Sequence, residues 1–414
     1  MVTVSAPSFD PLAHLRDPGR PDDPEIDVFL HGTVFLDIIF TGLGRLPDPG
    51  TEVWAEGMGS GPGGIANLAV GAARLGLRTA LGAAFGDDAY GEFCWRTLAD
   101  QEHIDLTHSA RFSGWHSPVT VSIATDGDRR MVTHEHPPPV SADQMIGTPP
   151  RARAVLLDLN VDHPLGVGDP ERGWADTAKA QGALLFSDIG WDESERWPTQ
   201  VLDQLQHVHA FMPNAAEAMA YTRADTPQDA LYAIADRVPL AVVTNGANGA
   251  LAIDNTTGEE VSVPALRVPA IDPTGAGDVF DAAVTMGTLA GWPLADRLNF
   301  AALCSALAVQ QFGGSLAAPG WGDIADWWQH TRARNDGHAA SRSLARRFAF
   351  LDDIVGSVPR TATRRATATV AQLSDASAPT TVVPGTPTGQ ANSAATDQDA
   401  TQVNEDDPVT VDGN

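Results

Sequence analysis

The sequence predicts an α/β protein whose core is a mostly parallel, doubly wound sheet, with a small β-sheet lid beside it. The first observation is that short, continuous apolar runs alternate along the chain with segments of helical periodicity. This alternation indicates βαβ units, in which parallel strands are buried under helices on both faces. The second observation is that two stretches with period-two alternation interrupt this order, and they predict hairpins outside the main sheet.

The apolar runs predict the strands of the main sheet, because each has about the length of one buried strand. They occupy residues 27–32, 79–86, 154–160, 183–190, 209–214 and 240–246. Helical patterns fall between them at residues 64–76, 90–101, 215–222 and 227–238. The two interrupting stretches, with turn signals at 47–50 and 126–128, predict a lid built from about 37–58 and 117–136. Such a lid would exclude water from a ligand crevice.

Composition divides the chain into three parts. Residues 1–26 are rich in Pro and Asp and predict a flexible N-terminal extension. Residues 358–414 have no aromatic side chain and are dominated by Thr, Ala, Ser, Pro and Asp. Such a segment cannot bury enough apolar surface to offset its ordering entropy, so it predicts a disordered acidic tail. The folded domain therefore spans 27–357.

The charge of the chain excludes several classes of partner. A net charge of −27 argues against nucleic acid and against an anionic membrane, which both attract clustered cations. Lys179 is the only lysine, so a catalytic lysine is confined to one position. Cys94 and Cys304 provide no disulfide framework, and the N-terminus lacks the pattern of a secretory signal. We therefore expect a soluble, cytoplasmic protein.

The stretch DPTGAGD, residues 272–278, carries the strongest chemical signal. The backbone N–H groups of Gly275, Ala276 and Gly277 would form an anion hole, strengthened by the dipole of the helix that follows. Asp278 would repel a bound anion, but it suits a general base that takes a proton from a hydroxyl attacking a phosphoryl group. The alternative is that Asp278 only caps the helix.

This stretch resembles the D-x-T-G-A-G-D signature of the ribokinase-like carbohydrate kinases, the PfkB family. Three further landmarks of that family occur in the same order, namely Gly-Gly before Ala-Asn at 63–67, Asn-x-x-Glu at 214–217 and Thr-x-Gly-x-x-Gly at 244–249. The resemblance covers residues 28–330. It implies a ribokinase-like kinase domain that transfers the γ-phosphoryl group of ATP to a hydroxyl of a small sugar.

The resemblance also implies where the sugar would bind. Asp37, at the C-terminal end of the first strand, would hold sugar hydroxyls with its two carboxylate oxygens. The alternative is an Asp that only forms a turn or a cap. Gly63, Gly64 and Asn67 begin a helix and would bring backbone N–H groups and an amide to the same ligand. Asn160 ends a strand at a place where some relatives contact the substrate.

Mg²⁺ is the cofactor that the resemblance implies. Asn214 and Glu217 would hold its hydration shell, since residues three apart at a helix start share one face. The alternative is an ordinary helix N-terminus with an Asn cap and an acid at the third position. Asp272 would line a site for a monovalent cation, with K⁺ as the candidate ion.

The nucleotide would lie against the turn that follows the strand at 240–246. Thr244, Gly246 and Gly249 would let the backbone and one hydroxyl approach the phosphates of ATP, with Asn214 beside them. The alternative is a plain hairpin turn.

A second glycine pattern leads to a different hypothesis, which we do not favour. Gly59, Gly61 and Gly64 match the G-x-G-x-x-G fingerprint of dinucleotide-binding proteins. That fingerprint should follow a core strand, whereas the residues before it here predict a lid hairpin.

Two other functions remain open. A nucleoside kinase would share the fold and the motifs, and only the substrate pocket would distinguish it. A sugar-binding regulator without catalytic activity is the second, although Asp278 with its glycines argues against it. Lid strands of relatives often pair between subunits, so a homodimer through the lid is an expectation by analogy.

Overall fold

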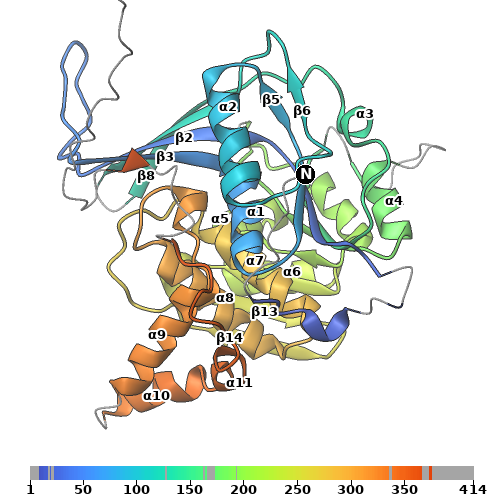
Figure 1. Cartoon of the computed structure of the whole chain (residues 1–414), viewed down its shortest axis with the longest axis vertical. Helices are drawn as coiled ribbons and strands as arrows, with labels where there is room; N and C mark the ends of the chain where they lie inside the picture. Colours follow the sequence, from blue (N-terminus) through green and yellow to red (C-terminus); the bar gives the residue numbers. More distant parts are fainter. Residues whose placement is uncertain are drawn as a thin grey trace, which may run out of the picture. The chain divides into compact units, whose positions relative to one another are not determined.

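The computed structural model describes residues 9–16, 19, 23–125, 128–161, 164–165, 173–192, 194–334, 338–365 and 373–374. Its main element is a sheet in the order β14-β13-β12-β11-β10-β9-β1-β4 (Figure 1). Strands β12 to β4 in this order run parallel, and β13 and β14 add an antiparallel edge. The predicted mostly parallel sheet is confirmed. The strands are β1 (Ile26–His31), β4 (Thr79–Gly82), β9 (Ala152–Asp158), β10 (Leu184–Asp188), β11 (Ala210–Phe211), β12 (Leu240–Thr244), β13 (Ala250–Asp254) and β14 (Glu259–Val263).

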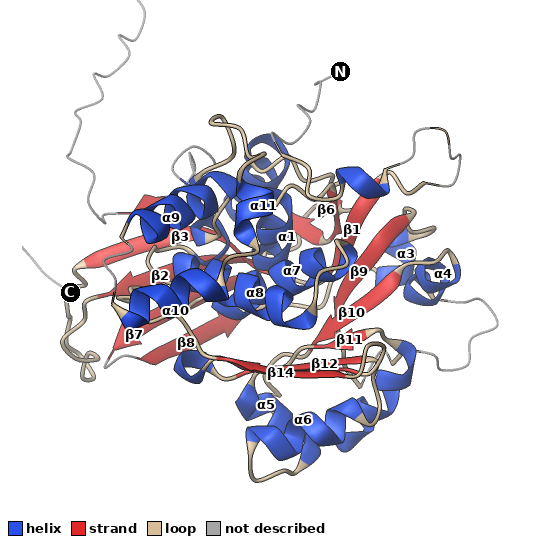
Figure 2. Cartoon of the chain, turned by 90° about the horizontal axis from the view of Figure 1, so that it is seen from below, coloured by secondary structure: helices blue, strands red, loops and turns tan. Residues whose placement is uncertain are grey.

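Alternate side chains of β1 show that this sheet is buried on both faces. Val28 and Leu30 belong to one apolar cluster, and Phe29 belongs to another. The first cluster includes α1 (Ile65–Arg74), α7 (Ala276–Leu289) and α8 (Leu294–Ala308), and the second includes α4 (Trp174–Ala180), α5 (Ala215–Thr222) and α6 (Pro227–Ala235). Figure 2 shows α7 and α8 on the opposite side of the sheet from α5 and α6. The doubly wound arrangement is therefore confirmed.

A smaller sheet has the order β15-β3-β2-β7-β8. Its strands are β2 (Val34–Thr41), β3 (Gly57–Gly64), β7 (Val119–Thr125), β8 (Asp128–His134) and β15 (Leu373–Ser374). The pairs β2–β3 and β7–β8 are antiparallel, as the two predicted hairpins require, and β2 joins them by pairing parallel with β7. Whether this sheet acts as a lid stays a prediction.

Shorter elements complete the described part of the chain. They are α2 (Ala89–Arg96), α3 (Ala142–Ile146), α9 (Trp321–Ala333), α10 (Ala339–Arg347), α11 (Leu351–Val355), the parallel pair β5 (Ala84–Gly86) and β6 (Ala110–Phe112), a π-helical segment (Thr97–Gln101) and 3₁₀ turns at Ala13–Leu15, Thr199–His207, Gly246–Asn248 and Gly314–Ala317. None of the described helices combines the length and the apolar character needed to cross a membrane.

Part of the predicted flexible extension is packed against the domain. Leu12 is fully buried, and the ring of Phe9 meets the ring of Trp321 edge-on with centroids 4.8 Å apart. Arg16 donates to the buried carboxylate of Asp27 at 2.8 Å. The prediction of flexibility is therefore wrong for residues 9–16. Two apolar side chains and one ion pair suffice to anchor the segment, although its overall composition is that of a loop.

The packed domain also extends beyond the predicted start of the tail. Ala362 is 3% exposed, the backbone N–H of Arg365 donates to Asp323 at 3.0 Å, and Arg364 pairs with Asp326 at 3.1 Å. The predicted start of the tail at residue 358 is too early, because Arg364 and Arg365 contact acids of α9. The rest of the predicted tail, apart from β15, lies outside the described residues.

Candidate active site

The turn before α7 is fixed by its own acid. Asp272, which is 2% exposed, accepts hydrogen bonds from the backbone N–H of Thr274 (2.9 Å) and of Gly313 (3.2 Å). Gly275 follows with φ of 72°, and a Cβ there would stand 3.2 Å from the backbone of the neighbouring loop. Only glycine accepts both this conformation and this approach. The turn thereby places Asp278 in the first turn of α7.

One of the three amides predicted to form an anion hole is used within the turn. The N–H of Ala276 donates to the carbonyl oxygen of Pro273 at 3.2 Å. The prediction that all three amides point at a ligand is therefore wrong for Ala276, because this donor closes the turn from which α7 starts. Gly275 and Gly277 lie at the positive end of the α7 dipole.

The first helix of the domain contacts Asp278 directly. Asn67 on α1 is 4% exposed, and its Nδ2 donates to Oδ2 of Asp278 at 2.9 Å. The Oδ1 of Asn67 is buried and has no hydrogen-bond partner among the described residues. Gly64, with φ of 61°, is the N-cap of α1 and turns the chain from β3 into this helix. The sequence predicted Asn67 as a sugar ligand, but its contact with Asp278 was not predicted.

Asp37 lies in the smaller sheet, not at the end of the first strand. It is a residue of β2, opposite Gly61 of β3 and Thr120 of β7, and it is 6% exposed. The predicted position is corrected because β1 ends at His31 and the chain then re-enters an extended strand. A Cβ at Gly63 would stand 2.0 Å from Oδ2 of Asp37, so the missing side chain makes room for this carboxylate.

The residues predicted for magnesium and for nucleotide come together beside β12. The backbones of Asn214 and Thr244 form an isolated parallel bridge, and the N–H of Thr244 donates to Pro213 at 3.2 Å. Beyond Thr244 the chain makes a hairpin turn into β13, which was the alternative for this motif. Gly249 has φ of 99°, and a Cβ there would stand 1.9 Å from the carbonyl oxygen of Val263. The turn therefore requires glycine at this position.

Asn214 and Glu217 form a reciprocal cap of α5. Oδ1 of Asn214 accepts from the Glu217 N–H, and Oε2 of Glu217 accepts from the Asn214 N–H, both at 3.0 Å. The capping alternative thus describes their contacts in this structure. Glu217 is nonetheless 9% exposed, and burial together with the charges of Asp278 and Asp158 raises its pKa to about 7. Such a carboxylate favours a cation close by.

Acids gather at the carboxyl end of the main sheet. Asp158 and Asp188 end β9 and β10, and Asp281 follows Asp278 by one turn of α7. Asp158 is accessible at this edge, but the surrounding protein and the charge of Asp278 raise its pKa to about 6. Burial and neighbouring negative charges also raise the pKa of Asp188 and of Asp281 well above the usual range.

Asp158, Asp188 and Asp281 line a small cavity. Its volume of about 10 Å³ is the space of roughly one water molecule. The Oδ1 atoms of Asp188 and Asp281 are buried and have no hydrogen-bond partner among the described residues. The sequence analysis did not predict Asp158 and Asp281. The sequence did hold a signal for each. Asp158 stands at the end of a predicted strand, and Asp281 stands three residues after the proposed base.

This donor set fits Mg²⁺. Carboxylate oxygens are the ligands that Mg²⁺ prefers, and a cation or its water would satisfy the orphaned Oδ1 of Asp188. Within the described residues, no group of three His, Cys, Asp or Glu side chains is placed to hold a metal ion directly. Binding through water at Asn214 and Glu217 stays a prediction.

The remaining candidates are placed as follows. Asn160 is exposed just beyond the end of β9, and its carbonyl oxygen accepts from Gln204 at 2.7 Å. Gly59, Gly61 and Gly64 all lie in β3 of the smaller sheet. No core strand leads into them, so the G-x-G-x-x-G match is not a dinucleotide fingerprint.

Comparison with known proteins finds one family that matches this chain. The model of the pfkB family carbohydrate kinases matches residues 28–320. A ribokinase of Lactococcus lactis is 25% identical over 299 residues, which cover 70% of this chain and 92% of the relative. An aminoimidazole riboside kinase of Salmonella typhimurium is 28% identical over 277 residues, which cover 62% of this chain and 85% of the relative.

A solved structure gives the same fold. The structure of Arabidopsis thaliana ribokinase complexed with ribose and ATP superposes with a TM-score of 0.55 at 21% identity. The match covers 71% of this chain and 96% of that chain. The large sheet, the smaller sheet and their helices are thus the ribokinase fold.

Proposed function

Because the chain belongs to the pfkB family of carbohydrate kinases, we propose that it transfers the γ-phosphoryl group of ATP to a hydroxyl of a small sugar, with Asp278 as the general base. Members of this family are phosphotransferases with an alcohol group as acceptor, and this chain is one of them. The observation that carries the proposed mechanism is the placement of Asp278 in the first turn of α7, held by the amide of Asn67 at 2.9 Å.

In the proposed reaction the acceptor hydroxyl gives its proton to the carboxylate of Asp278. Its oxygen forms a bond to the γ-phosphorus while the bond from that phosphorus to the β-phosphate oxygen breaks, and ADP leaves. Asn67 keeps one oxygen of Asp278 in place, which fixes the direction of the other. The positive end of the α7 dipole, beside Gly275 and Gly277, stabilises the charge that develops on the transferred group.

Mg²⁺ would be held beside α5 by the hydration-shell contacts of Asn214 and Glu217, together with Asp188. When bound, it neutralises charge on the phosphates of ATP. The turn from Thr244 to Gly249 would receive those phosphates, since the bridge between Asn214 and Thr244 keeps the two places adjacent. A K⁺ site at Asp272 remains part of the proposal.

The acceptor would lie between the two sheets. Asp37, seated over Gly63, supplies two oxygens for sugar hydroxyls from the smaller sheet, and Asn160 lies at the rim of the main sheet. A second acceptor class is a riboside, because one of the relatives is an aminoimidazole riboside kinase. Both acceptors present hydroxyls of a five- or six-membered ring to the same acid.

The test is ADP release from Mg-ATP across pentoses, hexoses, sugar acids and nucleosides. We expect turnover with one class, and Asp278→Asn should lower kcat by about 10²-fold or more, the usual contribution of a general base. Asp225→Asn, an exposed acid, is the matched control and should keep full activity. Sugar binding without any ADP release would contradict the kinase and favour the silent regulator.

A further inference from the structure

Arg74, the last residue of α1, is only 2% exposed although it carries a charge. Its Nε and Nη2 donate to the two carboxylate oxygens of Glu102 at 2.9 Å and 2.8 Å. Its Nη1 donates to the backbone carbonyl oxygens of Leu316 at 2.9 Å and Ala318 at 2.7 Å. A buried charge is costly unless it is paired and hydrogen-bonded, and these contacts accommodate it. The proposed reaction assigns no role to this arginine.

Glu102 reaches Arg74 from an irregular helix end. The π-helical segment Thr97–Gln101 follows α2, and Glu102 ends it by donating its N–H to the carbonyl oxygen of Thr97 at 3.0 Å. π-helical turns are rare and occur frequently at functional sites. Because Glu102 binds the guanidinium group by two parallel hydrogen bonds, it fixes the plane of that group. The pair therefore determines where Nη1 of Arg74 points.

Residues 313–318, called here the 313–318 loop, lie along α1. Near one end of the helix, Leu316 and Ala318 accept from Arg74. Both residues are fully buried, so their carbonyl oxygens need a donor from within the protein. About two helical turns before Arg74, a Cβ at Gly314 would stand 2.9 Å from Oδ1 of Asn67. The loop thus connects Arg74 to Asn67 along the side of one helix.

The 313–318 loop also contacts the parts of the proposed site that hold Asp278. Gly314 lies beside the amide of Asn67, whose Nδ2 donates to Asp278 at 2.9 Å. A Cβ at Gly275 would stand 3.2 Å from the backbone of Gly314, so the turn before α7 packs on the same loop. A shift of the loop would therefore move the Asn67 amide and, with it, the carboxylate of Asp278.

We propose that Arg74 is a positioning residue for the general base and acts through the 313–318 loop and Asn67. Arg74 holds the loop, the loop holds the Asn67 amide, and the amide holds one oxygen of Asp278. The inference rests on the proposed kinase activity, since it concerns the alignment of Asp278 with the acceptor hydroxyl. Lysine cannot take this role, because it lacks the planar group that binds a carboxylate and two carbonyl oxygens together.

The test is a double-variant cycle in kcat. ADP release is measured on the full chain with the acceptor that gives the highest turnover among pentoses, hexoses, sugar acids and nucleosides. We expect Arg74→Lys to lower kcat about tenfold or more, because the base is then rarely aligned. In an Asn67→Ala background the same change should cost little further, since the residue through which Arg74 acts is gone. A merely structural role would lower kcat equally in both backgrounds.

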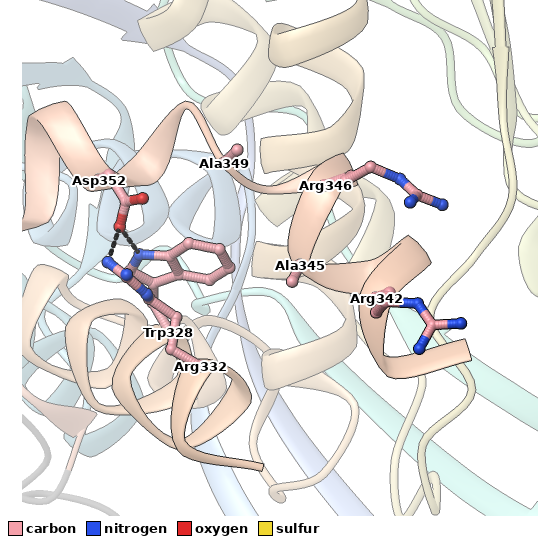
Figure 3. Close-up of a pocket in the computed structure, with 7 residues that line it drawn as sticks. All are labelled: Trp328, Arg332, Arg342, Ala345, Arg346, Ala349 and Asp352. Atoms are coloured by element: carbon pink, nitrogen blue, oxygen red, sulfur yellow. Dashed lines mark hydrogen bonds and ion pairs between the residues drawn. The ribbon is translucent and has the colours of Figure 1, made fainter. Parts of the chain in front are cut away.

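Two other arginines provide matched controls. Arg297 makes a comparable buried pair with Asp254 at 2.9 Å, at the end of β13 away from the proposed nucleotide turn. Arg332 makes an exposed pair with Asp352 at 2.6 Å, beside the pocket among α9, α10 and α11 that Figure 3 shows. Arg297→Lys should lower the urea midpoint as Arg74→Lys does. Both control variants should nonetheless keep the wild-type kcat.

Ser315→Ala keeps the test decisive if Arg74→Lys does not fold. The hydroxyl of Ser315 donates to the carbonyl oxygen of Pro62 in β3, so its removal loosens the 313–318 loop without changing a charge. We expect kcat to fall severalfold in the wild-type background and to change little in the Asn67→Ala background.

A loss of kcat that is equal with and without Asn67, or that Arg297→Lys reproduces, would overturn the positioning role. Its failure is distinguishable from failure of the proposed function. A wild-type chain that releases no ADP with any acceptor contradicts the kinase and the positioning role together. A wild-type chain that turns over, but whose Arg74 and Asn67 losses are additive, contradicts only the positioning role.

Discussion

Asn67 and Asp278 lie 211 positions apart in the sequence, yet Nδ2 of the first donates to Oδ2 of the second at 2.9 Å. The bond connects α1, which follows the smaller sheet, to α7, which carries the proposed base. It holds one oxygen of a carboxylate that lies in the first turn of α7. The geometry of the base thus depends on a residue outside its own motif.

Replacement of Asn67 by Ala tests this dependence. We expect kcat to fall about tenfold to a hundredfold, because a base held loosely is rarely aligned with the acceptor hydroxyl. Steady-state kinetics with the best acceptor measures the effect. In an Asp278→Asn background the same change should cost nothing further, since the residue it positions is already inactive. Additive losses in the double variant would contradict a positioning role.

Gly63→Ala tests whether acceptor binding depends on the position of the Asp37 carboxylate. The new Cβ would stand 2.0 Å from Oδ2 of Asp37, so this carboxylate must move. We expect the KM for the acceptor to rise at least severalfold while the KM for ATP stays unchanged. Gly44→Ala is the control, because a Cβ at Gly44 meets nothing within 4 Å. An unchanged acceptor KM in Gly63→Ala would contradict a role of Asp37 in acceptor binding.

The raised pKa of Glu217 predicts a pH-dependent stability. Its pKa rises from 4.5 to about 7 on folding, so the folded state holds the proton more tightly than the unfolded state. The resulting stabilisation is full below pH 4.5 and is lost as the pH rises through 7. Without Mg²⁺, the melting temperature should therefore fall between about pH 5 and about pH 8 by a few degrees.

Mg²⁺ and a variant separate this contribution from others. Since Mg²⁺ binds ionised carboxylates, it should raise the melting temperature more at about pH 8 than at about pH 5. Glu217→Gln keeps an oxygen for the helix cap but cannot ionise. It should reduce the pH dependence without abolishing it, because the raised pKa values of Asp158, Asp188 and Asp281 remain. Equal Mg²⁺ effects at both pH values would argue against a cation beside Glu217.

Arg347 should influence nucleotide binding from outside the site. Arg347→Ala removes the donor to Pro264 and to Asn299, and so loosens the segment on which Gly249 packs. We expect the KM for ATP to rise severalfold with little change in the acceptor KM, as steady-state kinetics can measure. A variant whose ATP and acceptor KM values rise together would indicate general destabilisation instead.

Leu12→Ala tests the packing of the N-terminal segment. Leu12 is fully buried, so the change should lower the free energy of unfolding by about 2–4 kcal/mol, as for other buried leucines. Leu15→Ala is the control, since Leu15 lies in the 3₁₀ turn that Leu12 precedes and is 37% exposed. Urea unfolding of both variants measures the difference. Equal, small effects would show that the segment contributes little to stability.

Most of the main domain followed from local sequence patterns. The predicted helix at 215–222 is α5 residue for residue, and each of the six apolar runs overlaps a strand of the main sheet. The run at 79–86 is divided, since it forms β4 of the main sheet and β5 of a separate pair. Local patterns were sufficient because the buried face of each strand and helix is made of apolar residues whose spacing can be seen in its own sequence. The run at 209–214 was the weakest, since only 210–211 form β11 and Asn214 caps the next helix.

The site was harder to predict, because its contacts join distant segments. Asp158 and Asp281 are separated by more than a hundred residues, and only the sheet order brings them to one cavity. The engagement of Ala276 in its turn depends on a single backbone hydrogen bond, which composition does not reveal. Phe9 likewise looks like a loop residue until Trp321 is placed beside it.

The location of Asp37 has a consequence for selectivity. Asp37 lies in β2, which pairs with β3 on one side and β7 on the other. Gly63, which leaves room for the Asp37 carboxylate, belongs to β3 of the same sheet. Asp278 belongs to the other layer of the molecule. In the proposed reaction the acceptor would contact Asp37 from one sheet and Asp278 from the helix layer of the other. The distance between the two acids would then select acceptors by size, because a ring of the wrong size held by Asp37 would leave its hydroxyl out of reach of Asp278.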